Sequence, residues 1–344
     1  MRSPKVTVLM PVYNGEKYLK DAIESILTQD FTDFEFLIIN DGSSDSSEKI
    51  IATYSDIRIR LLKNEKNIGL VNTLNKGLEA ALGEYIVRMD CDDVSLKNRL
   101  TVQVNYMDKN TDIGACGSYY NMMIDGRKAV VDLPLNKHEM KSYMMFNCPI
   151  SHPTAIIRSS VIRKEKLSYN QDYIHAEDYQ FWSRLSECSN LANLPDVLLN
   201  YRMHENQITQ NQSFSTKKLE TLSLIRSHHL KLLNIVPSQE ELKVHHLVSD
   251  GGKAESESQM SQTELWLKKI INVNTKTKQL DDAYLGKIVL ERWLRMCFNF
   301  YGGTKGFKYF YNSEIYSEVK LPFKQKLELF KNLYNSYKRK LIKK

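Results

Sequence analysis

The sequence has few cysteines and none of the patterns that would give them a structural task. Its five cysteines are odd in number and form no CxxC pair over 344 residues: Cys91, Cys116, Cys148, Cys188 and Cys297. This argues against a disulfide scaffold and a zinc site, and it fits a reducing compartment. No apolar run approaches the roughly 20 residues that a membrane-spanning helix needs. Since no signal peptide is visible either, we expect a cytoplasmic protein.

The common glycine-rich phosphate-binding loops are also missing. No GxGxxG follows the first predicted strand, and the pattern GxxxxGK[ST] does not occur. These absences argue against Rossmann dehydrogenases and P-loop NTPases. A sheet that binds a diphosphate without such a loop needs a cation to neutralise it.

Strand-like and helix-like segments alternate through the first 93 residues. Apolar runs predict strands over 5–10, 34–39, 57–62 and 85–89, and helical spacing predicts helices over 16–28, 46–54 and 70–82. This order predicts βαβ units and a mostly parallel sheet with helices on both faces. Ligands of such sheets bind beyond the carboxyl ends of the strands. Three polar turns lie there, at 11–14, 41–42 and 90–92, so we expect a site at this edge.

The rest of the chain divides by charge as well as by pattern. Residues 1–214 carry 24 Lys and Arg against 28 Asp and Glu, a net charge of −4, whereas residues 215–344 carry 24 against 13, a net +11. Strand signals are mixed over 111–214 and thin out after 215. We therefore predict an α/β domain over 1–214, with halves of about 1–110 and 111–214, and a basic, mostly α-helical region over 215–344. No nucleic-acid-binding motif accompanies the basic region, and no nucleic-acid partner is expected.

Three carboxylates follow the apolar strand that ends at Met89: Asp90, Asp92 and Asp93. Closely spaced carboxylates repel one another and must be hydrated or neutralised. One interpretation is a site for Mg²⁺ or Mn²⁺, which take oxygen ligands. The alternative is an acidic turn in which Asp92 or Asp93 caps the next helix.

Four motifs occur in an order that resembles the family 2 glycosyltransferases of the GT-A fold. They are VLMPVYN at 8–14, NDGSSD at 40–45, NIGL at 67–70 and RMDCDD at 88–93. Segments at 152–154, 177–179 and 201–204 continue the resemblance to about residue 212. The resemblance implies a GT-A catalytic domain that transfers a sugar from a nucleoside-diphosphate sugar, with inversion and a divalent metal. UDP is the nucleotide that the resemblance favours.

The resemblance also implies roles for single residues. The nucleotide would be held by Pro11, Val12, Tyr13, Asp41, Asn67, Arg88, Asp90 and Asp92, with Asp41 accepting a hydrogen bond from the base. Asp92 would bind the metal under the diphosphate, and His204 matches a histidine placed against the metal or the diphosphate. Asp178 matches the general base. Arg99 or Lys97 would add positive charge near the departing diphosphate. The alternative is that both are ordinary surface residues.

Two further expectations concern the basic region. The polar stretch 249–263, which includes Gly251 and Gly252, predicts a loop or hinge. Two histidine pairs lie on helical segments without companion acids, and we expect them to be solvated: His228, His229, His245 and His246.

The end of the chain predicts a basic amphipathic helix over about 321–344. Its apolar residues recur at steps of three and four, at Phe323, Leu327, Phe330, Tyr334, Tyr337 and Leu341, among many lysines. Such a helix can lie on an anionic membrane, or it can pack on the C-terminal region or on a dimer partner. We hypothesise that it brings a peripheral enzyme to a glycan or lipid-linked glycan acceptor. The alternatives to a glycosyltransferase are a non-catalytic nucleotide-sugar-binding subunit and a nucleotidyltransferase, and the second lacks its expected glycine-rich loop.

Overall fold

The chain forms two compact units in this computed structural model, which describes residues 3–124, 126–205, 215–322, 324–327, 329 and 331. The first unit comprises Met1–Lys137 and Cys148–Leu222, and the second comprises His138–Asn147 and Ser223–Lys344. The segment His138–Asn147 therefore lies inside the predicted first domain by sequence but packs in the second unit. The division of the chain falls at Leu222, within a helix, rather than at residue 214.

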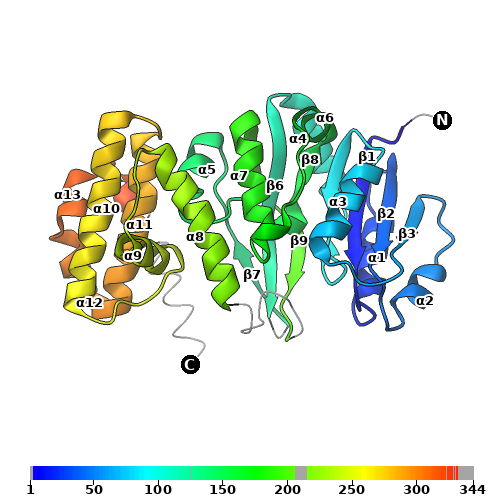
Figure 1. Cartoon of the computed structure of the whole chain (residues 1–344), viewed down its shortest axis with the longest axis horizontal. Coiled ribbons are helices and arrows are strands. Elements are labelled where there is room, and N and C mark those ends of the chain that lie inside the picture. The colour runs from blue at the N-terminus through cyan, green and yellow to red at the C-terminus, as the bar shows by residue number, and fades with distance from the viewer. Residues whose placement is uncertain are drawn as a thin grey trace. The chain divides into compact units, whose positions relative to one another are not determined.

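The first unit is built on one sheet whose first half is parallel (Figure 1). Its strand order is β3-β2-β1-β4-β8-β6-β9-β5, with β7 paired to β6. Strands β3, β2, β1 and β4 are parallel, whereas β8, β7 and β5 pair in the antiparallel sense. The strands are β1 (Val6–Val12), β2 (Phe34–Asn40), β3 (Ile59–Lys63), β4 (Tyr85–Arg88), β5 (Val94–Ser95), β6 (Ile113–Ile124), β7 (Arg127–Val131), β8 (Ile156–Arg158) and β9 (Asn190–Arg202).

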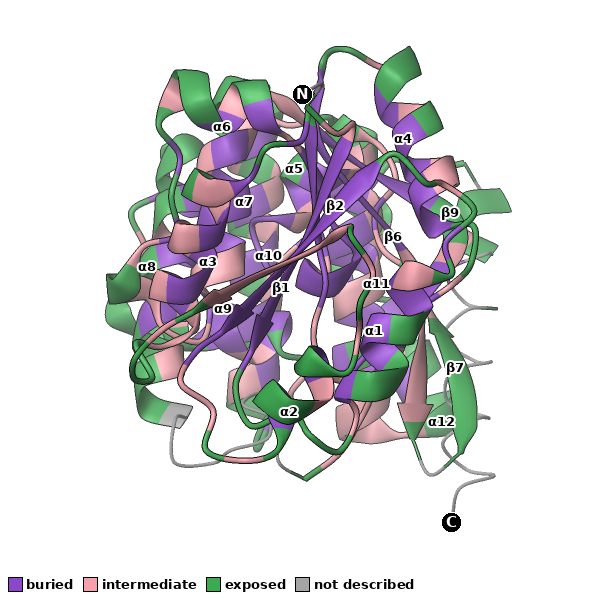
Figure 2. Ribbon diagram, turned by 90° about the vertical axis from the view of Figure 1, so that its right-hand side faces the viewer, coloured by how far each residue is buried: buried purple, intermediate pink, exposed green. Residues whose placement is uncertain are grey.

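Helices connect these strands, and apolar residues at helical spacing hold them to the sheet. In α1, for example, Leu19, Ala22, Ile23 and Ile26 are buried on one face. Figure 2 shows β1 and β2 buried along their length, as every residue of both strands is. The helices are α1 (Leu19–Leu27), α2 (Ser47–Ala52), α3 (Leu70–Ala80), α4 (Arg99–Lys109), α6 (Ser159–Glu165) and α7 (Glu177–Cys188), with 3₁₀ turns η1 (His152–Thr154) and η2 (Gln171–Tyr173). The predicted α/β fold class is confirmed.

The register of the sheet brings three strand ends together. Val12 at the end of β1 is paired with Asn40 at the end of β2, and Leu9 is paired with Arg88 at the end of β4. The turns after these strands therefore leave the sheet at the same edge. This is the edge at which the sequence predicts the site.

The second unit is helical among its described residues. Its core gathers large side chains such as Trp266, Trp293 and Leu294 around Phe146 from the inserted segment. Its elements are α5 (Lys137–Tyr143), the end of α8 (Ser215–Leu232), α9 (Gln239–Ser249), α10 (Glu257–Thr277), α11 (Asp282–Tyr301), α12 (Gly303–Tyr311) and α13 (Glu314–Glu318). None of the helices in the described part of the chain is long and apolar enough to cross a membrane.

The expectation that the paired histidines are solvated is wrong for His229, His245 and His246, which are buried, whereas His228 is exposed. At His245, neutral partners take the place of an acid. The indole Nε1 of Trp266 donates to His245 Nδ1 at 3.1 Å, so His245 Nε2 carries the proton that it donates to the Met145 carbonyl at 2.8 Å. Burial lowers the pKa of His245 to about 3 and keeps the ring neutral.

The predicted loop at 249–263 is too long. Residue Ser256 caps α10 by accepting a hydrogen bond from Gln259 N at 3.2 Å, so the helix begins at Glu257 and only 250–256 lie outside helices. Four polar residues of the stretch, Glu257, Ser258, Ser261 and Gln262, are exposed on α10, while Met260 and Thr263 are buried. Most of the predicted amphipathic helix at 321–344 lies outside the described residues.

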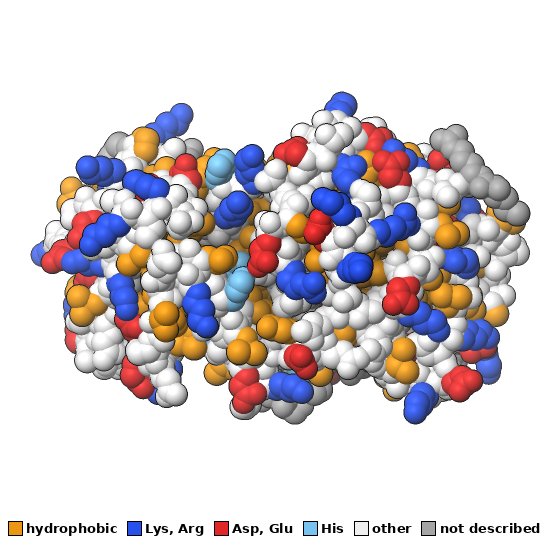
Figure 3. All heavy atoms as spheres, turned by 45° about the horizontal axis from the view of Figure 1, so that its top comes forward, with side chains coloured by type: hydrophobic (Ala, Val, Ile, Leu, Met, Phe, Trp, Pro, Cys, Tyr) orange, Lys and Arg blue, Asp and Glu red, His pale blue; other side chains and the backbone are white. Residues whose placement is uncertain are grey.

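On the face drawn in Figure 3, acidic and basic side chains are interspersed.

Candidate active site

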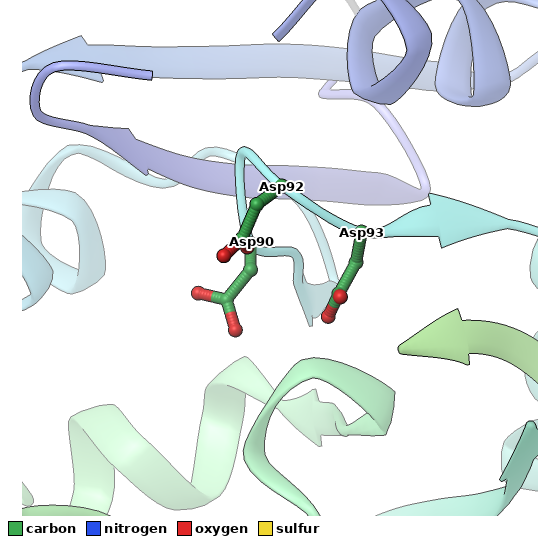
Figure 4. Close-up of side chains that lie close together, drawn as sticks. All are labelled: Asp90, Asp92 and Asp93. Atoms are coloured by element: carbon green, nitrogen blue, oxygen red, sulfur yellow. The ribbon is translucent and has the colours of Figure 1, made fainter. Parts of the chain in front are cut away.

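Three carboxylates project from the turn between β4 and β5 (Figure 4). Carboxylate oxygens of Asp90, Asp92 and Asp93 all lie within 4.8 Å of one another. Helix α4 begins only at Arg99, with Asn98 at its N-cap, so neither Asp92 nor Asp93 caps it. The turn is therefore an acidic cluster and not a helix start.

Buried cations offset part of this negative charge. The guanidinium of Arg88, which is 4% exposed, forms an ion pair with Asp90. Arg99 is fully buried behind the turn, where its Nη2 donates to the Arg88 carbonyl at 2.8 Å. Burial lowers the pKa of Arg99 to about 9. Lys97, by contrast, is exposed and pairs with Asp30 at 3.3 Å.

Asp93 is the most enclosed member of the cluster. It is fully buried, its Oδ1 accepts a hydrogen bond from Arg202 N at 3.0 Å, and its Oδ2 has no partner among the described residues. Burial, reinforced by the charges of Asp90 and Asp92, raises the pKa of Asp93 well above its usual range. A buried carboxylate oxygen without a donor is costly unless a cation or a proton satisfies it.

The cluster fits a divalent cation of the Mg²⁺ or Mn²⁺ type. It supplies carboxylate oxygens, which hard cations prefer, from three side chains that are close together. Such an ion would also satisfy the orphaned oxygen of Asp93. His204 reaches the same place from the end of β9, where its Nε2 lies 2.9 Å from Asp92 Oδ2.

The nucleotide side of the edge centres on Asp41. This buried carboxylate accepts hydrogen bonds from Asn64 Nδ2 at 2.8 Å, Ile68 N at 2.9 Å and Gly69 N at 3.0 Å. A carboxylate has about four acceptor positions, so roughly one remains for a ligand. These bonds fix the loop 64–69 against Asp41. Asn67 in this loop is exposed.

The turn after β1 is fastened to the turn after β2. Asn14, with φ of 50°, donates its backbone N–H to Ser43 Oγ at 3.0 Å and accepts from Ser44 N at 2.9 Å through its side chain. Tyr13, just before this anchor, is 50% exposed and available to a ligand. Pro11 and Val12 are buried, and the Val12 carbonyl already accepts from Asp41 N at 2.8 Å.

Asp178 lies in the first turn of α7 and is partly buried. Its Oδ1 accepts from Tyr179 N at 2.7 Å, and the Cys148 thiol lies 3.8 Å from its Oδ2. Burial raises the pKa of Asp178, and Arg88 opposes that shift. Burial likewise raises the pKa of Asp90, and the negative charges of Asp92 and Asp178 add to that shift. The structure thus brings Asp178 into the electrostatic environment of the acidic cluster, although 85 residues separate Asp178 from Asp93.

His152, from the motif at 152–154, is a buried packing residue. Its Nε2 lies 2.8 Å from the Tyr169 hydroxyl, and its ring packs edge-on against Trp182 with centroids 6.0 Å apart. Burial lowers its pKa well below the usual range, with Arg88 adding to the shift. His152 is therefore a neutral ring that packs between Tyr169 and Trp182.

The sequence gives no local sign of three residues that touch the site. Cys148 contacts Asp178, Tyr18 packs on His204, and Asp21 pairs with Arg202 at 2.5 Å. Tyr18 and Asp21 belong to the start of α1, whose helical spacing accounts for them without any role at the site. Their place beside the site is visible only in the structure, where the start of α1 contacts residues at and just after the end of β9.

The Glu177 carboxyl beside Asp178 makes stability depend on pH. Burial, and then the charge of Asp178, raises its pKa to about 7 from an ordinary value near 4.5. Because the unfolded state loses this proton first, stability falls as pH rises from about 4.5 to about 7 and then levels off. We expect Glu177→Gln to be more stable than wild type at pH 8, by an amount on the order of 1–3 kcal/mol, and equal to it near pH 4.5.

Urea unfolding at pH 5, 6, 7 and 8 measures this difference. Glu79→Gln, at an exposed position of α3, is the matched control and should show no such gain. A gain of Glu177→Gln that is the same at pH 5 and pH 8 would contradict the assignment.

Comparisons with known proteins agree with this geometry. The model for "Glycosyl transferase family 2" matches residues 7–168. An uncharacterized glycosyltransferase of Haemophilus influenzae is 34% identical over 262 residues, which cover 71% of this chain and 81% of the relative. The Escherichia coli protein WfgD, named a UDP-Glc:α-D-GlcNAc-diphosphoundecaprenol β-1,3-glucosyltransferase, is 27% identical over 215 residues, covering 62% of this chain and 83% of WfgD.

Among solved structures, the fold resembles S. aureus TarS 1–349 in complex with UDP-GlcNAc. The TM-score is 0.58 at 19% identity, over 85% of this chain and 86% of that one. This likeness supports the GT-A fold. Together with the family model and the Haemophilus relative, the ordered motifs and the acidic edge show that the chain is a glycosyltransferase and belongs to glycosyl transferase family 2.

Proposed function

We propose that this glycosyltransferase transfers a hexosyl or N-acetylhexosaminyl group from a UDP-sugar to a hydroxyl of a lipid-linked glycan, with inversion at the anomeric carbon. The observation that carries the proposal is the pairing of two acidic groups with different surroundings. The cluster at 90–93 lies at the nucleotide edge of the sheet, and Asp178 lies on α7 within its electrostatic reach. The cluster at 90–93 suits the diphosphate, and Asp178 suits the acceptor hydroxyl.

In the proposed reaction, the acceptor oxygen forms a bond to the anomeric carbon while the bond from that carbon to the diphosphate breaks. Asp178 takes the proton of the acceptor hydroxyl as the new bond forms. The nucleoside diphosphate leaves with the electron pair of the broken bond. Asp41 and the ring of Tyr13 hold the nucleoside, and Asn67 borders the same pocket.

The donor set at 90–93 supports a divalent ion in this reaction. Asp92 is the proposed metal ligand, with His204 beside it and Asp90 on the nucleotide side, where Arg88 balances its charge. When bound, Mg²⁺ or Mn²⁺ would neutralise the negative charge that develops on the leaving diphosphate. Arg88 is 4% exposed and pairs with Asp90, so its proposed part on the nucleotide side is to hold Asp90 in place.

The relatives support the choice of substrates. WfgD is named for a UDP-glucose donor and a diphosphoundecaprenol-linked acceptor, and TarS was solved with UDP-GlcNAc. We therefore place this chain in the assembly of a bacterial surface polysaccharide.

A donor panel tests the proposal. UDP-Glc, UDP-Gal, UDP-GlcNAc, UDP-GalNAc and GDP-Man are each added with Mn²⁺, Mg²⁺ or EDTA, and thermal stabilisation and slow hydrolysis are followed. A ligand at 100 times its Kd stabilises the folded state by about 2.7 kcal/mol. We expect a UDP-sugar to stabilise the protein with metal and less with EDTA. No response to any donor under any condition would refute the proposal.

We also propose that the basic C-terminal segment brings the enzyme to an anionic membrane, where a lipid-linked acceptor lies. Residues 332–344 carry five Lys and Arg and no acid: Lys338, Arg339, Lys340, Lys343 and Lys344. Each basic residue near such a surface adds about 1 kcal/mol of attraction. Truncation after Glu318 would remove the basic segment, but it would also remove Val319, Leu321 and Leu329, which are buried in the core of the second unit. A loss of membrane binding could then reflect unfolding.

Replacing these five residues by glutamine in the full chain is the sharper test. We expect sedimentation with phosphatidylglycerol vesicles to fall at least tenfold, while sedimentation with neutral phosphatidylcholine vesicles stays low for both proteins. Equal sedimentation of the variant and the wild type with anionic vesicles would contradict this role.

A further inference from the structure

Tyr18 at the start of α1 contacts the end of β9 with the face of its ring. The ring centroid of Tyr18 lies 4.9 Å from that of His204, with an angle of 40° between the planes. The guanidinium carbon of Arg202 lies 4.9 Å from the same centroid, and Lys17 Nζ lies 5.0 Å from it. Cations and imidazole rings both pack favourably on an aromatic face.

The two residues that rest on Tyr18 are the ones that hold the acidic cluster. His204 Nε2 lies 2.9 Å from Asp92 Oδ2, and Arg202 N donates to Asp93 Oδ1 at 3.0 Å. The Arg202 guanidinium turns back to α1, where its Nη2 bonds Asp21 Oδ2 at 2.5 Å. Tyr18 and Asp21 are one helical turn apart, so a single face of α1 holds the end of β9.

From these contacts we propose that Tyr18 is a positioning residue, whose ring holds His204 against Asp92 and thereby shapes the site for the diphosphate and its metal. This inference rests on the proposed function. Tyr18 does not reach the acidic cluster itself and acts through His204. The Tyr18 side chain makes no capping hydrogen bond to α1, although Tyr18 is its N-cap residue.

The contacts predict which substitutions matter. They use the ring and not the hydroxyl, so Tyr18→Phe should keep them. Tyr18→Leu removes the aromatic face on which His204 packs, while Arg202 keeps its bond to Asp21. We expect Tyr18→Leu to weaken UDP binding in the presence of Mn²⁺ about tenfold, to leave UDP binding in EDTA unchanged, and to raise KM more than it lowers kcat.

A double-mutant cycle with calorimetric UDP titrations tests the route through His204. The proteins are wild type, Tyr18→Phe, Tyr18→Leu, His204→Ala and the double variant Tyr18→Leu/His204→Ala, each with MnCl₂ and with EDTA. If Tyr18 acts through His204, the double variant binds UDP no more weakly than His204→Ala. Independent, additive losses would overturn the proposal, and so would wild-type binding by Tyr18→Leu.

Two results separate this inference from the proposed function. A wild type that binds no UDP with or without Mn²⁺ refutes the proposed donor and the Tyr18 role with it. A wild type that binds UDP together with an unaffected Tyr18→Leu refutes the Tyr18 role alone. Should Tyr18→Leu fail to fold, Tyr18→Met keeps the bulk without the ring face and makes the same distinction.

Discussion

Replacing Asp178 with asparagine is expected to lower the rate of sugar transfer by about 10²- to 10⁴-fold, the usual contribution of a general base. The amide is close in shape to the carboxylate and keeps an oxygen that can accept the Tyr179 N–H. It cannot, however, take the proton of the acceptor hydroxyl. Since Asp178 lies on α7 and not in the strand-end turns proposed to hold the nucleotide, UDP binding should change by less than threefold.

Initial rates with a saturating donor measure the first expectation, and calorimetric UDP titration measures the second. Asp172→Asn is the matched control, because Asp172 is exposed on η2 only six residues away and the change of charge is the same. Transfer by Asp178→Asn at the wild-type rate would remove Asp178 from the role of base. A loss of UDP binding instead would place Asp178 on the donor side.

The parallel half of the sheet could be predicted because its strands are short apolar runs between amphipathic helices. The predicted strand at 34–39 is β2 (Phe34–Asn40), and the predicted helix at 70–82 is α3 (Leu70–Ala80). Helix α4 (Arg99–Lys109) was missed because its buried face includes Arg99 and Gln103, which read as polar surface in a sequence. Strand β5 has two residues and carries no periodic signal.

The packing of His138–Asn147 in the second unit could not be read from the sequence, because it depends on partners far along the chain. Arg226 Nε donates to the Phe146 carbonyl at 3.0 Å, and Arg292 Nη2 donates to Asn147 Oδ1 at 2.6 Å. A buried arginine that satisfies a distant carbonyl looks like any surface arginine in a sequence. The same limit applies to the buried histidines of α8 and α9.

Of the site, the sequence could supply the strand-end turns but not the contacts between them. Asp41 and Asp90 follow apolar strands directly, so their shared edge follows from the parallel order. That Asp93 is buried with an orphaned oxygen, and that His204 bonds Asp92, depends on β9 returning to the same edge. The pairing of β9 with β5, the strand that follows the acidic turn, brings it there.

A second large effect is expected at Asp92. Its carboxylate contacts the imidazole of His204, while Arg88 neutralises Asp90 and the backbone N–H of Arg202 holds Asp93. Asp92→Asn keeps the size of the side chain and removes a negative charge. We expect this variant to bind UDP at least 10- to 100-fold more weakly than wild type when Mn²⁺ is present, the range seen when a metal site loses a supporting group.

The comparison with EDTA shows whether that loss is the loss of the metal. In EDTA, wild type and Asp92→Asn should bind UDP equally, because Asp41 and Tyr13 hold the nucleoside in both. Asp33→Asn, at an exposed position before β2, carries the same change of charge and should behave as wild type with and without Mn²⁺. If Asp92→Asn bound UDP as tightly as wild type with Mn²⁺, the acidic cluster would not be the metal site. If it bound more weakly in EDTA as well, the carboxylate would contact the nucleotide directly, and the division between Asp90 and Asp92 would have to be reversed.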